Sequence, residues 1–108
     1  MAKIFNSSNF QNEVIEASKT KPVLVDFFAV WCGPCQTQGP IVDELAELMA
    51  DKAVVGKLDV DQAQEISGSY GVMSIPTIII FRDGKEAKRL VGLQDKADLL
   101  EELKALIS

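Results

Sequence analysis

Residues 23–29 constrain the fold more than any other part of the chain. They read Val-Leu-Val-Asp-Phe-Phe-Ala, so a strand formed there is apolar on both faces except at Asp26. Successive side chains of a strand point to opposite faces, and a strand that is apolar on both faces needs cover on both. We therefore predict the central strand of a sheet with helices on both sides. A chain of 108 residues has room for one such core, so residues 1–108 are predicted to form a single domain.

The rest of the chain alternates strand and helix patterns around this run. Strands are predicted at Lys3–Phe5, residues 23–29, residues 53–60, Thr77–Arg82 and Lys85–Val91, with Asp83-Gly84 as the hairpin turn between the last two. Helices are predicted behind a capping box of Ser8 and Gln11, from about Pro34, over residues 62–70 behind Asp61 as cap, and behind Asp95 as cap. The order βαβαβαββα predicts an α/β fold with a central mixed β-sheet flanked by helices.

Apolar spacing predicts the buried faces of two helices. Residues three or four apart share one helical face. In the helix that begins near Pro34, the predicted stripe consists of Ile41, Leu45, Leu48 and Met49. In the last helix it consists of Leu99, Leu100, Leu103, Leu106 and Ile107.

Composition excludes several kinds of site. The chain has no histidine, which removes imidazole metal ligands and the Cys–His and Ser–His nucleophile pairs. Its net charge is −5 and its basic residues are scattered, so no nucleic-acid footprint is expected. The apolar runs are far shorter than the roughly 20 residues that span a bilayer, and no apolar signal segment follows Met1. We therefore expect a cytoplasmic protein that binds neither membrane nor nucleic acid.

Cys32-Gly33-Pro34-Cys35 lies at the predicted junction of the central strand and the next helix. A helix N-terminus presents unpaired N–H groups and a partial positive charge, which favour a thiolate over a thiol. Cys32 lies just before the helix, so we expect it to face solvent and to react first. Cys35 lies one turn further on and is expected to be shielded. A C-x-x-C pair beside a βαβ pattern is typical of redox chemistry.

Two other interpretations of the cysteine pair have less support. A structural disulfide that closes a loop of about four residues gains only about 2 kcal/mol in the loop-closure formula, against about 3 kcal/mol for fifteen residues. A tetrahedral zinc site needs about four ligands, and this chain offers two sulfurs and no histidine. We therefore predict a redox role for Cys32 and Cys35, and no metal site.

Asp26 is the one charged residue of the central run. An ionised carboxylate that is buried without a partner is costly, so burial would raise the pKa of Asp26. The alternatives are an exposed carboxylate at a strand end and a local hydrogen-bond acceptor. Carboxylates with shifted pKa values cluster at functional sites, which favours a role in proton transfer.

The chain resembles the thioredoxin family over essentially its whole length. The matching residues are Asp26, Trp31-Cys32-Gly33-Pro34-Cys35, Pro40, Lys57, Ile75-Pro76-Thr77, Gly84 and Gly92. Glutaredoxins usually carry Cys-Pro-Tyr-Cys and disulfide isomerases Cys-Gly-His-Cys, so the tetrapeptide distinguishes the chain from both. The resemblance implies the thioredoxin fold and a protein-disulfide reductase that cycles between dithiol and disulfide.

The resemblance also implies roles for single residues. Cys32 would attack a substrate disulfide, and Cys35 would resolve the mixed disulfide. Asp26 would relay the proton of Cys35, and Lys57 would be the partner of Asp26. The bond before Pro76 would be cis and lie against the cysteines. The substrate-binding residues would be Trp31 (also expected to shield the site), Gly33, Pro34, Ile75, Pro76 and Gly92.

Partners follow from the same resemblance. No cofactor would bind this chain. A separate reductase, either an NADPH-dependent flavoprotein or a ferredoxin-linked enzyme, would reduce it again after each cycle, and its substrates would be disulfide-containing proteins. We expect a monomer. Two alternatives stay open: a non-catalytic binding or folding partner with this fold, and a disulfide donor or isomerase.

The chain departs from the family pattern around the cysteines. Phe28 replaces the usual Trp, Val30 and Gln36 make the rim of the site neutral, and Thr37-Gln38-Gly39 replaces an apolar segment. Glycine at position 39 costs about 1 kcal/mol of helix stability relative to alanine. These departures bear on partner choice and on the rigidity of the helix.

Overall fold

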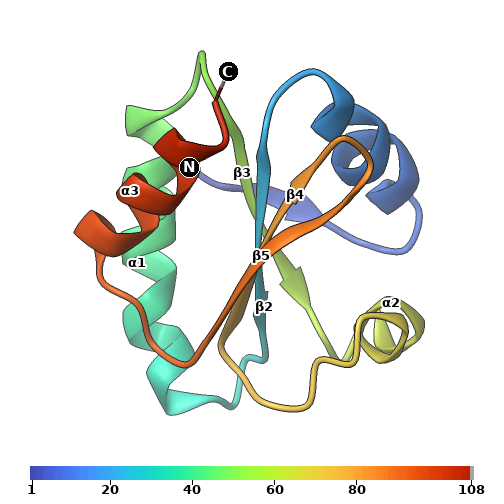
Figure 1. The fold of residues 1–108 in the computed structure, drawn as a ribbon. Helices are drawn as coiled ribbons and strands as arrows, with labels where there is room; N and C mark the ends of the chain where they lie inside the picture. Colours follow the sequence, from blue (N-terminus) through green and yellow to red (C-terminus); the bar gives the residue numbers. More distant parts are fainter. Residues whose placement is uncertain (108) are drawn as a thin grey trace.

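The computed structural model describes residues 1–107 and builds them around one mixed sheet (Figure 1). Ser108, the last residue of the predicted domain, lies outside the described residues. Within residues 1–107 the sheet has five strands, in the order β1-β3-β2-β4-β5. The strands are β1 (Lys3–Phe5), β2 (Val23–Phe28), β3 (Val54–Asp59), β4 (Thr77–Arg82) and β5 (Lys85–Val91). β1, β3 and β2 are parallel, whereas β4 runs antiparallel to both β2 and β5, which confirms the predicted mixed sheet.

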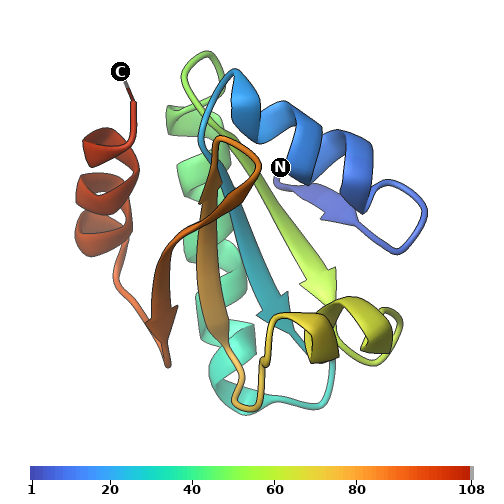
Figure 2. The ribbon, with the colours of Figure 1, turned by 45° about the vertical axis from the view of Figure 1, so that its right-hand side comes forward.

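Helices cover both faces of this sheet. On one face lie α1 (Gly33–Leu48) and α3 (Lys96–Ala105). On the other lie the π-helix η1 (Gln11–Glu16), the 3₁₀-helix η2 (Ala17–Lys19) and α2 (Gln64–Ser69). Figures 1 and 2 show these two layers from different sides. Among the described residues, no helix is both long enough and apolar enough to span a bilayer.

β2 supplies the centre of the core and places Asp26. Its residues alternate between the two faces: Val25 and Phe27 join the cluster under η1 and α2, while Leu24 joins the cluster under α1 and α3. The strand period of two puts Asp26 on the same face as Leu24, toward α1. The side chain that the sequence singles out therefore faces the helix that carries the cysteines.

The capping box predicted for the first helix is wrong: η1 begins at Gln11, its N-cap is Phe10, and no side chain caps it. Reciprocal hydrogen bonds between Asn6 and Asn9 lie in the turn that precedes η1. Asn6 Oδ1 accepts hydrogen bonds from the backbone N–H groups of Ser8 and Asn9, at 2.8 and 3.0 Å. Asn9 Oδ1 accepts one from the N–H of Asn6 at 2.8 Å. Asparagine favours such local bonds with neighbouring backbone N–H groups, so the polar residues before η1 form a turn and not the predicted Ser8 cap.

The predicted buried stripe of α1 is partly wrong. Leu48 is 59% exposed and Ile41 is half-buried. The buried residues of α1 are Cys35, Gln38, Val42 and Leu45. Steps of three and four residues from Cys35 define this face and lead on to Met49, so Leu48 lies beside the face and not within it. Leu45 and the capping residue Met49 are buried as predicted.

Asp61 does not cap α2. The helix spans Gln64–Ser69, its N-cap is Ala63, and no side chain caps it. The other predicted ends are confirmed: Asp95 Oδ1 accepts the N–H of Asp98 at 2.9 Å, and Gly71 has a φ of +62° where α2 ends. Asp83 and Gly84 both have positive φ, as the hairpin turn between β4 and β5 requires.

Candidate active site

The two cysteines lie where β2 passes into α1, and they form a disulfide. Cys32 is the N-cap of α1, and its Sγ accepts a hydrogen bond from the backbone N–H of Cys35 at 3.2 Å. In the dithiol form the same N–H and the helix N-terminus would stabilise negative charge on Cys32 Sγ. The geometry thus favours Cys32 as the thiolate.

Exposure does not distinguish the two cysteines, which corrects the expectation of an open Cys32 and a shielded Cys35. Each is 5% exposed in the disulfide form. They form a small apolar cluster with Ala29, against which Phe28 and Ile75 pack. The difference between the sulfurs therefore lies in their neighbours: a backbone N–H for Cys32, and a cavity behind Cys35.

This cavity connects Cys35 with Asp26. It has a volume of about 470 Å³, and its polar lining includes Asp26, Asp43 and Lys57. Cys35 lines it, and Cys32 does not. A proton leaving Cys35 can therefore reach Asp26 through a common space that includes no part of the attacking sulfur.

Asp26 is completely buried, and neither of its carboxyl oxygens has a hydrogen-bond partner among residues 1–107. Desolvation by burial raises the pKa of Asp26 from 3.8 to about 7. The positive charge of Lys57 opposes this rise, and the negative charge of Asp43 adds to it. The exposed carboxylate and the local acceptor, which sequence reasoning left open, are both excluded by this environment. A carboxyl group with a pKa near neutrality can accept and release a proton under ordinary conditions.

Lys57 lies beside Asp26 on the neighbouring strand, but its ion pair is with another residue. Asp26 and Lys57 are register partners on β2 and β3. Lys57 Nζ lies 3.1 Å from Asp43 Oδ2 on α1. Sequence reasoning missed Asp43. A usable signal was its spacing: Gln36, Gly39 and Asp43 follow one another at three and four residues, which places Asp43 on the helix face that carries the rim.

The segment before β4 lies against Cys32. The Ile75–Pro76 bond is cis, as the resemblance implies. The carbonyl oxygen of Ile75 is 3.8 Å from Cys32 Sγ. The carbonyl oxygen of Pro76 accepts a hydrogen bond from the N–H of Gly92 at 2.9 Å, and Gly92 has a φ of +92°. The structure thus brings Cys32, Ile75, Pro76 and Gly92 together, although they come from distant parts of the sequence.

Trp31 lies at the rim of this site. Its ring is largely exposed, and its Nε1–H donates a hydrogen bond to Asp61 Oδ2 at 2.8 Å. Asp61, predicted as the cap of α2, thus contacts Trp31, and α2 begins three residues further on at Gln64. Gly33 and Pro34, in the first turn of α1, are also exposed. That Trp31 shields the cysteines stays a prediction.

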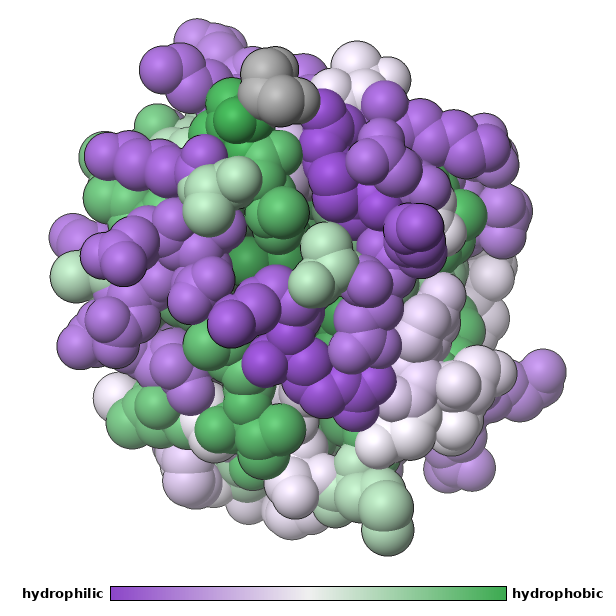
Figure 3. Space-filling model, in the orientation of Figure 1, coloured by the Kyte–Doolittle hydropathy of each residue, from purple (hydrophilic) through white to green (hydrophobic). Residues whose placement is uncertain are grey.

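The rim is more apolar than the predicted neutral pair Val30 and Gln36. Val30 is exposed, and sequence reasoning missed three exposed apolar residues next to the segments that meet at Cys32: Met73 lies two residues before Ile75, and Val91 and Leu93 flank Gly92. In Figure 3 hydrophilic residues lie on both sides of the upper face with a hydrophobic band between them, and hydrophobic or near-neutral residues also gather at the lower end. A substrate that docks beside Cys32 would meet an apolar surface.

Gln38 joins α1 to the loop between β5 and α3 and thereby restrains the helix near Gly39. Gln38 is completely buried. Its Nε2 donates to the carbonyl oxygen of Gln94 at 3.0 Å, and its Oε1 accepts the N–H of Gln94 at 2.8 Å. The polar residue in place of an apolar one therefore forms two hydrogen bonds between the helix of the cysteines and the segment that follows Gly92.

Replacing Gln38 by leucine is expected to lower the free energy of unfolding by about 1 to 2 kcal/mol, because the N–H and C=O of Gln94 lose their partners. Gln36→Leu is the matched control, since Gln36 is an exposed glutamine of the same helix. Urea unfolding of both variants measures the difference. Equal stabilities of the two variants would show that the Gln38 contacts contribute nothing.

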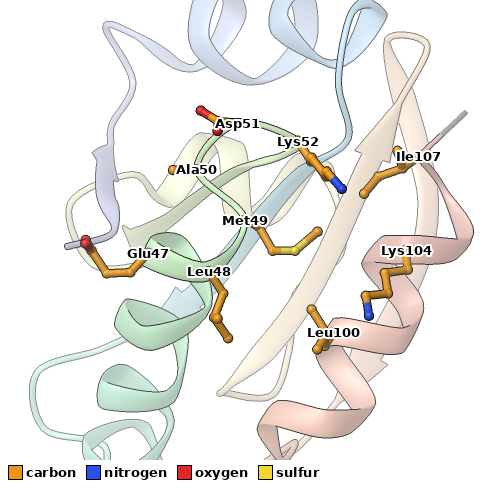
Figure 4. A pocket seen from close by; sticks show the side chains of 9 residues that line it. All are labelled: Glu47, Leu48, Met49, Ala50, Asp51, Lys52, Leu100, Lys104 and Ile107. Atoms are coloured by element: carbon orange, nitrogen blue, oxygen red, sulfur yellow. The ribbon is translucent and has the colours of Figure 1, made fainter.

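A second cavity lies far from these residues. It has a volume of about 500 Å³ and opens between the C-terminal end of α1 and α3 (Figure 4). Met49, Leu100 and Ile107 give it an apolar lining, and Lys52 and Lys104 stand among its charged residues. None of the described residues predicted to act in catalysis or substrate binding lines it.

Known proteins agree with this geometry. The model of the thioredoxin family matches residues 1–105. The thioredoxin of Alicyclobacillus acidocaldarius subsp. acidocaldarius is 47% identical over 96 residues, which are 89% of this chain and 89% of that protein. The thioredoxin of Mycobacterium bovis is 46% identical over 100 residues, 93% of this chain and 84% of that protein. The thioredoxin of Rickettsia prowazekii is 42% identical over 101 residues, 94% of each.

These matches extend over nearly the whole chain, and the disulfide lies at the start of α1 on a mixed sheet covered by helices on both faces. Sequence similarity, fold and cysteine geometry thus agree. The chain belongs to the thioredoxin family and is a thiol–disulfide oxidoreductase.

Proposed function

We propose that the chain reduces protein disulfides, with Cys32 as nucleophile, Cys35 as resolving thiol and Asp26 as proton acceptor. The observation that carries this proposal is the different surroundings of the two sulfurs. The Cys35 N–H points at Cys32 Sγ, and the cavity behind Cys35 contains Asp26. One sulfur is thus placed to be a thiolate from the start, and the other to lose its proton later.

The reaction then has two exchange steps. The thiolate of Cys32 attacks one sulfur of a substrate disulfide, forms a mixed disulfide and releases the other substrate sulfur as a thiolate, which takes a proton from solvent. Cys35 next gives its proton to the ionised carboxylate of Asp26, and its thiolate attacks Cys32 Sγ. The Cys32–Cys35 disulfide forms, the second substrate thiol leaves, and Asp26 passes its proton to water or to the departing sulfur.

The proposed substrate groove is lined by Trp31, Gly33, Pro34, Ile75, Pro76 and Gly92. Its support is that Ile75 lies next to Cys32 and that the N–H of Gly92 donates a hydrogen bond to the carbonyl oxygen of Pro76. A peptide that pairs with the backbone beside Pro76 would bring its disulfide to Cys32 Sγ. The exposed apolar residues of the rim would contact the flanking side chains.

The proposed partners are disulfide-containing proteins and a separate reductase, which is an NADPH-dependent flavoprotein or a ferredoxin-linked enzyme. The chain itself needs no cofactor for the exchange, because both electrons are held by its two thiols. We propose that it acts as a monomer in the cytoplasm.

Equilibration of the Cys32/Cys35 pair with mixtures of reduced and oxidised glutathione tests the direction of the reaction. A reductase is expected to have a reduction potential below about −230 mV, so that its disulfide persists in excess reduced glutathione. A potential above about −180 mV would instead indicate a disulfide donor or isomerase. The control is Gln36→Leu, which changes the rim and leaves both cysteines in place.

A further inference from the structure

Asp43 is held from two sides at the edge of the cavity that contains Asp26 and Cys35. Its Oδ2 lies 3.1 Å from Lys57 Nζ on β3, and its Oδ1 accepts a hydrogen bond from the backbone N–H of Ala2 at 2.9 Å. Both carboxylate oxygens are therefore engaged, one by a neighbouring strand and one by the residue that precedes β1. An ion pair fixed in this way places the ammonium of Lys57 at a defined point on α1.

Gly39 leaves the space that this arrangement needs. A Cβ atom at position 39 would lie 3.3 Å from Lys57 Nζ, which is closer than an ordinary van der Waals contact. Gly39 and Asp43 are one turn apart on α1, so they border the position of the Lys57 ammonium from two sides. The glycine that departs from the family pattern thus has a physical reason.

The Lys57 ammonium at this position forms no hydrogen bond with Asp26. Asp26 and Lys57 are register partners on adjacent strands, so a direct ion pair would be within the reach of a lysine side chain. Both oxygens of Asp26 nevertheless lack a hydrogen-bond partner among residues 1–107. The contact of Lys57 with Asp43 accounts for this.

We propose that Asp43 is a positioning residue: it holds the Lys57 ammonium against α1, so that Asp26 keeps a free oxygen for the proton of Cys35. This inference rests on the proposed function, in which Asp26 accepts that proton. It assigns to Asp43 an effect exerted through Lys57, without contact with substrate or with the sulfurs.

The charged groups around Asp26 and Lys57 determine whether the pKa of Asp26 should rise or fall when Asp43 loses its charge. Asp26 faces Lys57 from β3 and Asp43 and Cys35 from α1, whereas its register partner on β4 is the uncharged Ile78. The N-terminal ammonium also acts on Asp43, and it pairs with Glu47. Loss of the Asp43 charge removes a negative neighbour of Asp26 and frees Lys57 to approach it. Both changes favour the carboxylate, so the pKa of Asp26 should fall.

Asp43→Asn tests this with two readouts, one on the reduced protein and one on its mixed disulfide. The first is the titration midpoint of the Asp26 carboxyl carbon by NMR, which is expected to fall by about one pH unit. The second is the rate at which Cys35 resolves a preformed mixed disulfide, whose pH midpoint should fall by a similar amount. Glu44→Gln is the matched control, because it removes the same charge from the next residue of α1, whose partner is Lys96.

The Lys57→Met background shows whether Asp43 acts through Lys57. The shift caused by Asp43→Asn should there be less than half of its size in the wild-type background. An unchanged shift would mean that Asp43 acts by its own charge alone, and a shift equal to that of Glu44→Gln would mean no local effect; either result overturns the proposal. Asp26→Asn tests the proton-acceptor role of Asp26 separately from the positioning role of Asp43. If this variant resolves the mixed disulfide at the wild-type rate, the proton-acceptor role fails. The NMR shift caused by Asp43→Asn still decides whether Asp43 positions Lys57.

Discussion

Replacing Cys32 by serine is expected to abolish disulfide reduction, with a loss of at least about a thousandfold in rate, because the nucleophile of the first step is gone. Cys35→Ser should still attack a substrate disulfide, but it should stop at the mixed disulfide, since no second thiol is present to resolve it. The different surroundings of the two sulfurs are the reason for this asymmetry. The backbone N–H of Cys35 donates a hydrogen bond to Cys32 Sγ, and this N–H stays in place when the Cys35 side chain is replaced.

Intact-mass analysis under non-reducing conditions measures both outcomes after each variant has been mixed with a disulfide-containing protein. The Cys35→Ser variant should accumulate a covalent adduct that dithiothreitol releases, and the Cys32→Ser variant should not. The reverse pattern, with adducts on Cys32→Ser, would exchange the assignment of attacking and resolving cysteine.

Replacing Asp26 by alanine or leucine is expected to stabilise the protein at neutral and alkaline pH. Burial raises the pKa of Asp26 from 3.8 to about 7, so the folded state holds the proton more tightly than the unfolded state. Stability from this group is therefore complete below the unfolded pKa, falls as pH rises from 3.8 toward 7, and stays low above that range. At about 1.4 kcal/mol per pH unit, a rise of about three units corresponds to about 4 kcal/mol. The cavity left by alanine offsets part of this gain.

Denaturant unfolding of the wild type and the Asp26 variants at acid and alkaline pH checks this prediction. The difference in unfolding free energy between variant and wild type should grow as pH rises and then level off. A difference that does not depend on pH would contradict a buried, protonated Asp26.

The same substitutions should slow resolution by Cys35 and leave attack by Cys32 nearly unchanged. General-base removal typically costs about a hundredfold or more in the step that it serves. Single-turnover mixing separates the two steps, because the mixed disulfide accumulates when resolution is slow. An unchanged resolution rate would show that Asp26 does not accept the proton of Cys35.

Much of the sheet could be predicted because its strands carry strong local signals. The apolar run at residues 23–29 became β2, and Thr77–Arg82, the Asp83-Gly84 turn and Lys85–Val91 formed the predicted hairpin. The order of the strands in the sheet was not predicted. The helix starts were harder to predict, since Ser8 and Asp61 have the chemistry of caps and yet no side chain caps η1 or α2.

The site could be predicted where the local sequence carries the chemistry, and not where contacts join distant residues. Cys32 and Cys35 are recognisable from four consecutive residues. The bond between Asp43 and Lys57 and the bonds between Gln38 and Gln94 depend on how α1 packs against β3 and against the loop after β5. The resemblance named Lys57 as the partner of Asp26, and packing gave it an ion pair with Asp43 instead.

The measurement that tests the central claim most directly is a mass balance between the chain and a substrate disulfide. Reduced protein is mixed with native insulin, quenched in acid, and analysed by intact mass together with the released insulin thiols. The chain is expected to lose the two hydrogen atoms of Cys32 and Cys35 for each insulin disulfide cleaved, and the Cys32→Ser/Cys35→Ser double variant is expected to cleave none. Cleavage of insulin by the double variant at the wild-type rate, or a wild-type chain that keeps its dithiol mass while insulin is reduced, would contradict thiol–disulfide exchange at this pair.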